Sequence, residues 1–251
     1  MKFGVADYGM NVWSGGLFDI EARLTNLKNA GFDGIERLEA TTEAQALYNA
    51  MIARKLQMNF LTCQAPAVTL SLQWSAALQF NYVWLDVNDH SRNLPIEVFC
   101  RRANECVAAA ARYGIRVGLH NHLGSRIENQ QELLYFMQTC PDAMLLLDIG
   151  HLHAAGGDCI EVIEKYAARL CAVHFKDIEI LDESLGLERW YERLRFCGLG
   201  EGNCSFDYTA IARELIRKNY QNWFLIEHDS HTDVPEKQLK QSLDILKNII
   251  A

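Results

Sequence analysis

The sequence predicts one α/β domain over residues 1–251, with the architecture of a closed (β/α)8 barrel, the TIM barrel. Two observations predict this fold. Short apolar runs of β-forming residues alternate with longer helical segments from one end of the chain to the other. The chain also contains no linker, low-complexity tract or break in composition, and barrels of this kind have about 250 residues. An open, doubly wound parallel sheet is the alternative.

Eight strands are expected, because eight runs rich in β-branched, aromatic and other apolar residues end at polar or turn-forming ones. They are expected at residues 2–6, 33–38, 56–62, 82–87, 115–121, 143–149, 170–176 and 222–228. Parallel strands need helical crossovers, and closing the sheet into a barrel removes its unpaired edges. Eight strand-helix units therefore favour the barrel over the open sheet.

Helices are expected between the strands, most clearly at residues 17–31, 96–114 and 206–220. Gly31 and Gly114 stand where C-terminal caps belong. The segment 65–79 has a weaker helical pattern, and the segment 177–205 is unusually long for a connection after a strand. We expect this long connection, which contains Trp190, to form a lid or a subunit contact.

The composition limits the classes of partner. The formal charge of −8 repels phosphate backbones and anionic lipids, so neither a nucleic acid nor a membrane is an expected partner. The eight cysteines include no C-x-x-C pair and stand singly in apolar stretches, which is typical of reduced, buried thiols in a cytoplasmic protein. Asp7 interrupts the first apolar run, so this segment fits neither a secretory signal nor a transit peptide.

Ionisable residues follow the apolar part of four successive strands. Because strand side chains alternate, they lie on one face of each strand, and the C-terminal ends of barrel strands meet on a single catalytic face. A shared cation would relieve the repulsion between buried carboxylates. Two imidazoles and two carboxylates suit one divalent ion, namely Mn²⁺, Co²⁺, Zn²⁺ or Fe²⁺, with Mg²⁺ a poorer fit. The four expected metal ligands are His120, Asp148, His174 and Glu227.

Three further residues near these strand ends are candidates for catalysis and substrate binding. Glu36 points to the same face from the second strand, although a salt bridge to a neighbouring strand explains it nearly as well. Lys176 shares the face of His174 and would hold a substrate oxygen, although many lysines at such positions are only solvated. His151 follows Asp148 by three residues, where a substrate hydroxyl would be contacted. The joint pattern, rather than any single residue, supports a site.

Five motifs in order resemble one known family. They are "GFDGIE", "LLLDIGHL", "AVHFKD", "GLGEG" and, in the last strand, "LIEHD". Together they resemble the xylose isomerase-like TIM-barrel superfamily of sugar phosphate isomerases and epimerases. The resemblance implies a divalent metal at the strand C-termini, held by Asp148, His174 and Glu227. It also implies that His151 contacts the substrate and that Glu36 faces the pocket.

The fifth strand departs from part of this family. Ketose 3-epimerases end this strand in a Glu that is both metal ligand and acid/base, whereas "VGLHNH" places His120 there. A metal-bound imidazole has no free lone pair with which to take a proton from carbon. His122 or Glu128 is the alternative fifth-strand ligand. The "HNHLGS" segment instead resembles inosose dehydratases, which are family members that eliminate water from a cyclic polyol ketone.

These observations predict a metal-dependent sugar or sugar-phosphate isomerase or epimerase that acts on a keto-sugar or polyol through a metal-stabilised enediolate. Glu227 or Glu36 is the expected base, Lys176 or His151 the expected proton donor, and His122, His151 and Lys176 bind substrate. The alternatives are an inosose dehydratase-like lyase, a sugar-binding barrel without activity and an abasic-site endonuclease, which the acidic charge disfavours. The long seventh connection is compatible with a homo-oligomer.

Overall fold

The computed structural model describes residues 1–6, 19–85, 91–229 and 233–250. Each of the eight expected strands is present, the third starting and ending later than expected. The expected positions 17, 18, 86 and 87 lie outside the described residues. The barrel strands are β1 (Lys2–Val5), β2 (Gly34–Glu39), β3 (Asn59–Gln64), β4 (Tyr82–Trp84), β5 (Arg116–His120), β6 (Met144–Asp148), β7 (Leu170–Phe175) and β10 (Trp223–Ile226).

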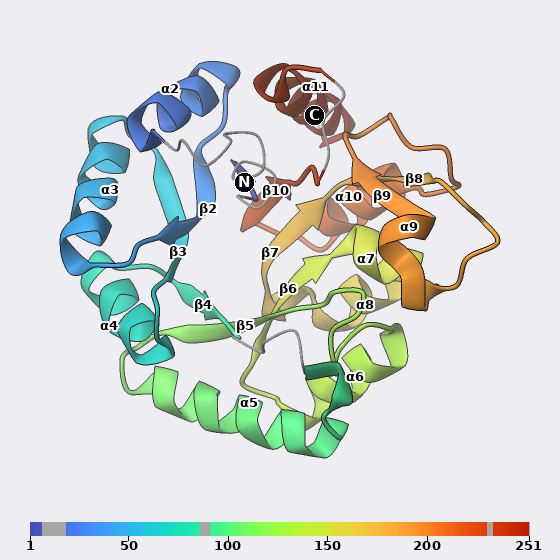
Figure 1. Cartoon of the computed structure of the whole chain (residues 1–251), viewed down its shortest axis with the longest axis horizontal. Coiled ribbons are helices and arrows are strands. Elements are labelled where there is room, and N and C mark those ends of the chain that lie inside the picture. Colours follow the sequence, from blue (N-terminus) through green and yellow to red (C-terminus); the bar gives the residue numbers. More distant parts are fainter. Residues whose placement is uncertain (7–18, 86–90, 230–232, 251) are drawn as a thin grey trace.

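The eight strands form one parallel sheet that closes into a barrel. Their order is β3-β2-β1-β10-β7-β6-β5-β4, so the first barrel strand pairs with the last, from Lys2 opposite Trp223 to Val5 opposite Ile226. The two outer strands, β3 and β4, contact each other and nearly complete the circle (Figure 1). The (β/α)8 barrel is therefore confirmed, and the open sheet is wrong.

Helices surround the strands on the outside of the barrel (Figure 1). The weak segment 65–79 does form a helix, α4. Asp19 accepts a hydrogen bond from the Ala22 N–H at the start of α2, and Gly31 ends this helix at φ 99°, a conformation that favours glycine. The helices are α2 (Ile20–Ala30), α3 (Glu43–Lys55), α4 (Val68–Leu78), η1 (Ser91–Asn93), α5 (Ile96–Ala111), α6 (Gln130–Thr139), α7 (Ile149–Ala154), α8 (Cys159–Tyr166), η2 (Ala167–Arg169), α10 (Tyr208–Arg217) and α11 (Pro235–Ile250).

The long connection after β7 is folded rather than an open loop. It contains an antiparallel hairpin of β8 (Asp177–Ile180) and β9 (Leu194–Cys197), joined through η3 (Leu187–Arg189) and α9 (Trp190–Arg193). The Asp177 carboxylate accepts hydrogen bonds from the backbone N–H groups of Gly200 and Gly202. A Cβ at Gly202 would lie 2.3 Å from Asp177 Oδ1, so glycine is needed for this close approach. These bonds thus hold the turn that follows β9 against the start of β8.

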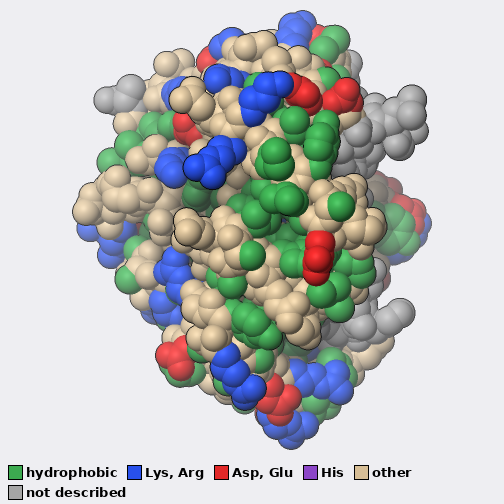
Figure 2. All heavy atoms as spheres, turned by 90° about the vertical axis from the view of Figure 1, so that its left-hand side faces the viewer, with side chains coloured by type: hydrophobic (Ala, Val, Ile, Leu, Met, Phe, Trp, Pro, Cys, Tyr) green, Lys and Arg blue, Asp and Glu red, His purple; other side chains and the backbone are tan. Residues whose placement is uncertain are grey.

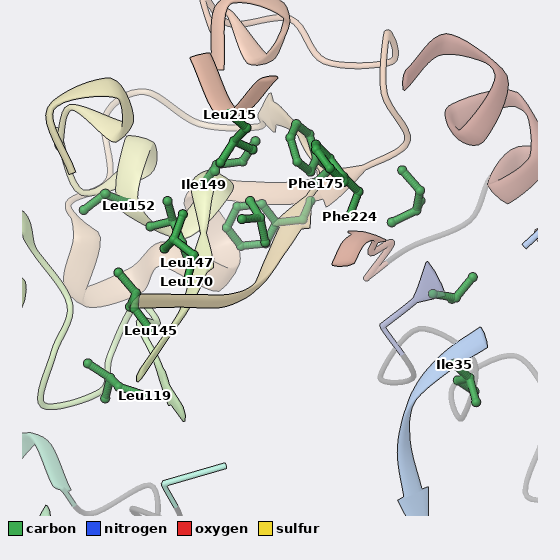
Figure 3. Close-up of a cluster of buried hydrophobic side chains, with 14 of the residues drawn as sticks. Ile35, Leu119, Leu145, Leu147, Ile149, Leu152, Leu170, Phe175, Leu215 and Phe224 are labelled. Atoms are coloured by element: carbon green, nitrogen blue, oxygen red, sulfur yellow. The ribbon is translucent and has the colours of Figure 1, made fainter. Parts of the chain in front are cut away.

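Two hydrophobic layers support the barrel. The larger layer lies between the strands and the helices, and Figure 3 shows part of it around β6, β7 and β10. Burying each of its large side chains stabilises the fold by about 1.5–3 kcal/mol. The smaller layer fills the barrel itself, below the C-terminal strand ends. Its buried members are Leu61, Tyr82, Met144, Leu146, Cys171, Ala172, Trp223 and Leu225.

Most of the thiols lie inside the protein, whereas several large apolar side chains lie on its surface. All eight cysteines are free thiols and six of them are buried, as expected. Hydrophobic side chains gather on the face that Figure 2 shows, which is the left-hand side of Figure 1, where α3 lies. The exposed large apolar side chains of α3 are Leu47, Tyr48 and Met51. Within the described residues, no helix is long and apolar enough to cross a membrane.

Candidate active site

Four side chains converge at the C-terminal ends of β5, β6, β7 and β10, as the sequence predicted. One nitrogen or oxygen from each of His120, Asp148, His174 and Glu227 lies within 4.8 Å of the other three. His120 Nε2 is 3.3 Å from Asp148 Oδ2, and His174 Nδ1 is 2.8 Å from Glu227 Oε2. Asp148 and His174 are fully buried, and Glu227 is nearly so. We call this group the four-residue cluster.

Local structure aims Asp148 into the barrel. Its Oδ1 atom accepts a hydrogen bond from the His151 N–H at 2.8 Å and so caps the N-terminus of α7. Asn121 holds the backbone of the same residue on both sides, because its side chain accepts from the Asp148 N–H and donates to the Asp148 carbonyl. These bonds leave Oδ2 facing the cluster. The Asp148 carboxylate therefore has two roles: Oδ1 caps α7, and Oδ2 faces the cluster.

Lys176 lies inside the site rather than in solvent. Its Nζ atom is 2.8 Å from Asp148 Oδ2 and 2.5 Å from Glu227 Oε2, and the side chain is fully buried. Burial would raise the pKa of each carboxyl, but the Lys176 ammonium and the neighbouring histidines together outweigh it: the pKa of Asp148 falls well below its usual value, and that of Glu227 falls to about 2. Burial would lower the pKa of Lys176, but the two carboxylates raise it. The three groups therefore hold one another in charged form.

Glu36 is connected to the cluster through His174. Its carboxylate lies 3.0 Å from His174 Nε2 and also accepts hydrogen bonds from the Trp84 indole N–H and the Tyr82 hydroxyl. Burial would lower the pKa of His174, but Glu36 and Glu227 raise it well above its usual value. Sequence reasoning missed Tyr82 and Trp84 as site residues. Their signal is the alternation in "YVW", which turns both aromatic side chains of β4 inward.

His122 and His151 lie together beside the cluster. Their ring centroids are 3.7 Å apart, and Trp190 of α9 and Phe196 of β9 pack against the pair. Burial lowers the pKa of His122 to about 4 and that of His151 well below its usual value. The hairpin after β7 therefore supplies an aromatic wall to the site, as the lid hypothesis for Trp190 requires.

His120, rather than Glu128, is the fifth-strand residue that joins the cluster. Glu128 accepts a hydrogen bond from the Gly124 N–H and lies 3.1 Å from an Arg92 guanidinium nitrogen. His122 is not a member of the cluster, and its Nδ1 atom binds the Leu123 carbonyl at 2.6 Å. Neither alternative therefore replaces His120 in the geometry of the site.

The cluster has the properties of a cation site. His174 Nδ1 and Glu227 Oε2 are buried and 2.8 Å apart, yet neither has a hydrogen-bond partner in favourable geometry among the described residues. Two imidazole nitrogens and two carboxylate oxygens match the preferences of borderline divalent metals. The donor set and these unsatisfied atoms together fit a metal ion.

Gly150 makes room for Lys176. A Cβ at this position would lie 2.5 Å from Lys176 Cγ and 2.9 Å from Cδ. We therefore expect Gly150→Ala to push the lysine stem away from its two carboxylates and to cost about 1–3 kcal/mol of stability. Denaturant unfolding of the metal-free protein measures this cost, and an unchanged midpoint would contradict the prediction.

The fold and the cluster define the chain as a TIM-barrel protein with a candidate metal site at its C-terminal strand ends. A family model described as "Xylose isomerase-like TIM barrel" matches residues 70–249, which is more than half of the chain. The chain belongs to the xylose isomerase-like TIM-barrel family. The family that the sequence motifs resemble is thereby confirmed.

Curated relatives of this chain include several inosose dehydratases. The chain is 28% identical to the inosose dehydratase of Bacillus licheniformis over 133 residues, which cover 50% of this chain and 44% of that protein. It is 32% identical to that of Erwinia tasmaniensis over 134 residues, which cover 49% of this chain and 44% of the relative. The match thus spans less than half the length of these relatives.

Solved structures show the same fold at lower identity. A probable 3-DHS dehydratase, AsbF of Bacillus anthracis, superimposes with a TM-score of 0.77 at 17% identity over 99% of both chains. D-Psicose 3-epimerase of Clostridium cellulolyticum, solved with D-tagatose, gives 0.74 at 13% identity over 100% of this chain and 99% of that one. The IOLI protein with a binding zinc atom gives 0.72 at 14% identity over 100% and 98%.

Proposed function

We propose that this chain is a divalent-metal-dependent enzyme that removes a proton from the carbon next to the carbonyl of a sugar or polyol ketone. The four-residue cluster carries this proposal, because it gathers two imidazoles and two carboxylates at the catalytic face of the barrel and leaves buried polar atoms unsatisfied. The inosose dehydratase relatives support a small polyol ketone as the substrate.

The proposed ligands are His120, Asp148, His174 and Glu227, and the donor set favours Mn²⁺, Co²⁺, Zn²⁺ or Fe²⁺. When bound, such an ion would supply a Lewis acid that polarises the substrate carbonyl. Glu36 suits the role of a partner that orients His174, since it binds the ring nitrogen on the far side from Glu227. Its carboxylate already accepts hydrogen bonds from three donors. These bonds favour a role for Glu36 in orienting His174 over its predicted role as a base.

Glu227 is the proposed base. Its carboxylate has two oxygens, between which ligation and proton transfer can be divided. Lys176, whose Nζ lies 2.5 Å from Glu227 Oε2, is the proposed donor to a substrate oxygen, with His151 as a second donor beside it. Trp190 and Phe196 cover the imidazole pair and would limit the access of water.

Two overall reactions share this proton abstraction. Expulsion of a β-hydroxyl gives dehydration, which the curated relatives favour. The single candidate base beside a buried ammonium also suits elimination, because a base and an acid act on different atoms of the substrate. Return of the proton to another face or to the adjoining carbon gives epimerisation or isomerisation, and Lys176 next to Glu227 would supply such a proton.

Hydrogen exchange at carbon tests the proposal. Mn²⁺-loaded protein is incubated in D₂O with a panel of keto-sugars and inososes, and deuterium next to the carbonyl is measured by NMR. We expect exchange with at least one member, loss of exchange in Glu227→Gln, and no change in Glu105→Gln, which alters an exposed carboxylate of α5. The products separate dehydration from isomerisation. Metal-loaded, folded protein that exchanges nothing across the panel would overturn the proposal.

Metal binding is expected to release about one proton at pH 7. The raised pKa of His174 keeps both ring nitrogens protonated without the metal, and ligation through Nδ1 needs a lone pair there while Nε2–H stays on Glu36. Affinity should therefore rise about tenfold per pH unit until the pH passes the pKa of His174. Calorimetry of Mn²⁺ binding in two buffers of different ionisation enthalpy counts the protons. Zero release at pH 7 would contradict this expectation.

A further inference from the structure

The backbone of Leu123 contacts both members of the imidazole pair. Its carbonyl oxygen lies 2.6 Å from His122 Nδ1, and its N–H points to His151 Nδ1 at 3.3 Å. A carbonyl can only accept a hydrogen bond, so His122 Nδ1 carries a hydrogen. An amide N–H can only donate one, so His151 Nδ1 carries a lone pair. The Leu123 backbone therefore requires a protonated Nδ1 in His122 and an unprotonated Nδ1 in His151.

Both rings are in surroundings that favour the neutral form. The lone pair on His151 Nδ1 already requires a neutral ring. The His122 ring lies 3.7 Å from that of His151 and close to the Trp190 indole, and no carboxylate within the described residues binds it. A neutral imidazole has one N–H, so the remaining nitrogens must differ. His122 Nε2 is an acceptor, and His151 Nε2 is a donor.

These two Nε2 atoms are the ones available to a ligand. Within the described part of the chain, no hydrogen bond engages either of them. The pair borders the four-residue cluster, because the His120 ring centroid lies 5.7 Å from that of His122 and 6.1 Å from that of His151. A substrate held at the cluster would therefore meet one acceptor and one donor side by side.

We propose that the Leu123 backbone locks His122 and His151 in opposite tautomers, and that the pair recognises a neutral hydroxyl next to a second oxygen. The hydroxyl donates to His122 Nε2, and the neighbouring carbonyl or hydroxyl oxygen accepts from His151 Nε2–H. A phosphate monoester dianion or a carboxylate offers acceptors only and would face the lone pair of His122 unfavourably. The identity of the ligand rests on the proposed function, whereas the tautomers do not.

Nitrogen NMR tests the tautomers without any activity assay. Long-range ¹H–¹⁵N correlation of ¹⁵N-histidine-labelled, Zn²⁺-loaded protein distinguishes a protonated from a bare ring nitrogen. We expect Nδ1–H for His122 and Nε2–H for His151, each assigned by its absence in His122→Phe or His151→Phe. His153→Phe is the control, because His153 lies on the same helix as His151 but stacks on Phe206. Equal tautomers, or rapid exchange between them, would overturn the proposal.

Ligand titration of the same sample tests the recognition. An inosose is expected to shift both Nε2 signals and to bind about tenfold more weakly to His122→Phe, with Zn²⁺ affinity kept within about threefold. Acetate, which offers acceptors only, is expected to leave the His122 signal unchanged. An acetate-induced shift without an inosose shift would overturn the neutral-hydroxyl assignment. Correct tautomers and an inosose shift without hydrogen exchange at carbon would instead count against the proposed function alone.

Discussion

Asp148→Asn is expected to abolish metal-dependent activity while leaving the barrel folded. The amide oxygen of asparagine can still accept the His151 N–H and cap α7, but the substitution removes the negative charge that faces His120, His174 and Lys176. We expect Mn²⁺ affinity to fall at least about 100-fold, since even outer-shell partners of a metal cost about 10- to 100-fold when removed. Calorimetric titration and hydrogen exchange at carbon measure the two losses.

Comparing Asp148→Ala with Asp148→Asn separates the effect of losing the Asp148 charge from the effect of losing the hydrogen bond that caps α7. Asp148→Ala removes both and should cost about 1 kcal/mol more than Asp148→Asn for the lost cap. Asp158→Asn is the matched control, because Asp158 caps α8 in the same way but is exposed. It should bind Mn²⁺ as the unaltered protein does. If Asp148→Asn retained that affinity as well, the proposed metal site would be wrong.

Lys176→Met is expected to destabilise the metal-free protein strongly and to make it depend on metal. The methionine fills a similar volume but leaves Asp148 and Glu227 buried without the ammonium that contacts both. Breaking a buried ion pair from one side costs about 3–5 kcal/mol. Mn²⁺ should recover much of this loss, because the cation would neutralise the same two carboxylates. Thermal unfolding with and without Mn²⁺ measures both effects.

Lys165→Met provides the control for this substitution. Lys165 pairs with Glu161 on the exposed face of α8, and such a surface pair contributes at most about 1 kcal/mol. Both substitutions remove the same charge and shorten the side chain equally. A difference in stability between the two variants therefore reports the effect of burial. A Lys176→Met protein that is as stable as the unaltered one without metal would contradict the view that Lys176 neutralises the cluster.

The sequence predicted the barrel and the four-residue cluster because both depend on local patterns. Alternation within a strand places Asp148 on the inner face two positions after Leu146, and the C-terminal ends of parallel strands must meet once the barrel closes. These two rules need no knowledge of distant contacts. The β8–β9 hairpin in the long segment after β7 was not predicted from the sequence. It is stabilised by strand pairing and by the hydrogen bonds of Asp177 to two later glycines, and no local pattern shows these contacts.

The order of the elements and the strand on which each ionisable residue stands follow from hydrophobic periodicity along the chain. The partners of each ionisable group follow instead from the packing of distant segments. Glu36 meets His174 from 138 positions away in the chain, and the Leu123 backbone meets the ring of His151 across 28. Such partners depend on how the barrel closes and on differences of a few tenths of an ångström in the positions of side chains. Side-chain packing sets these positions, and no local sequence pattern encodes them.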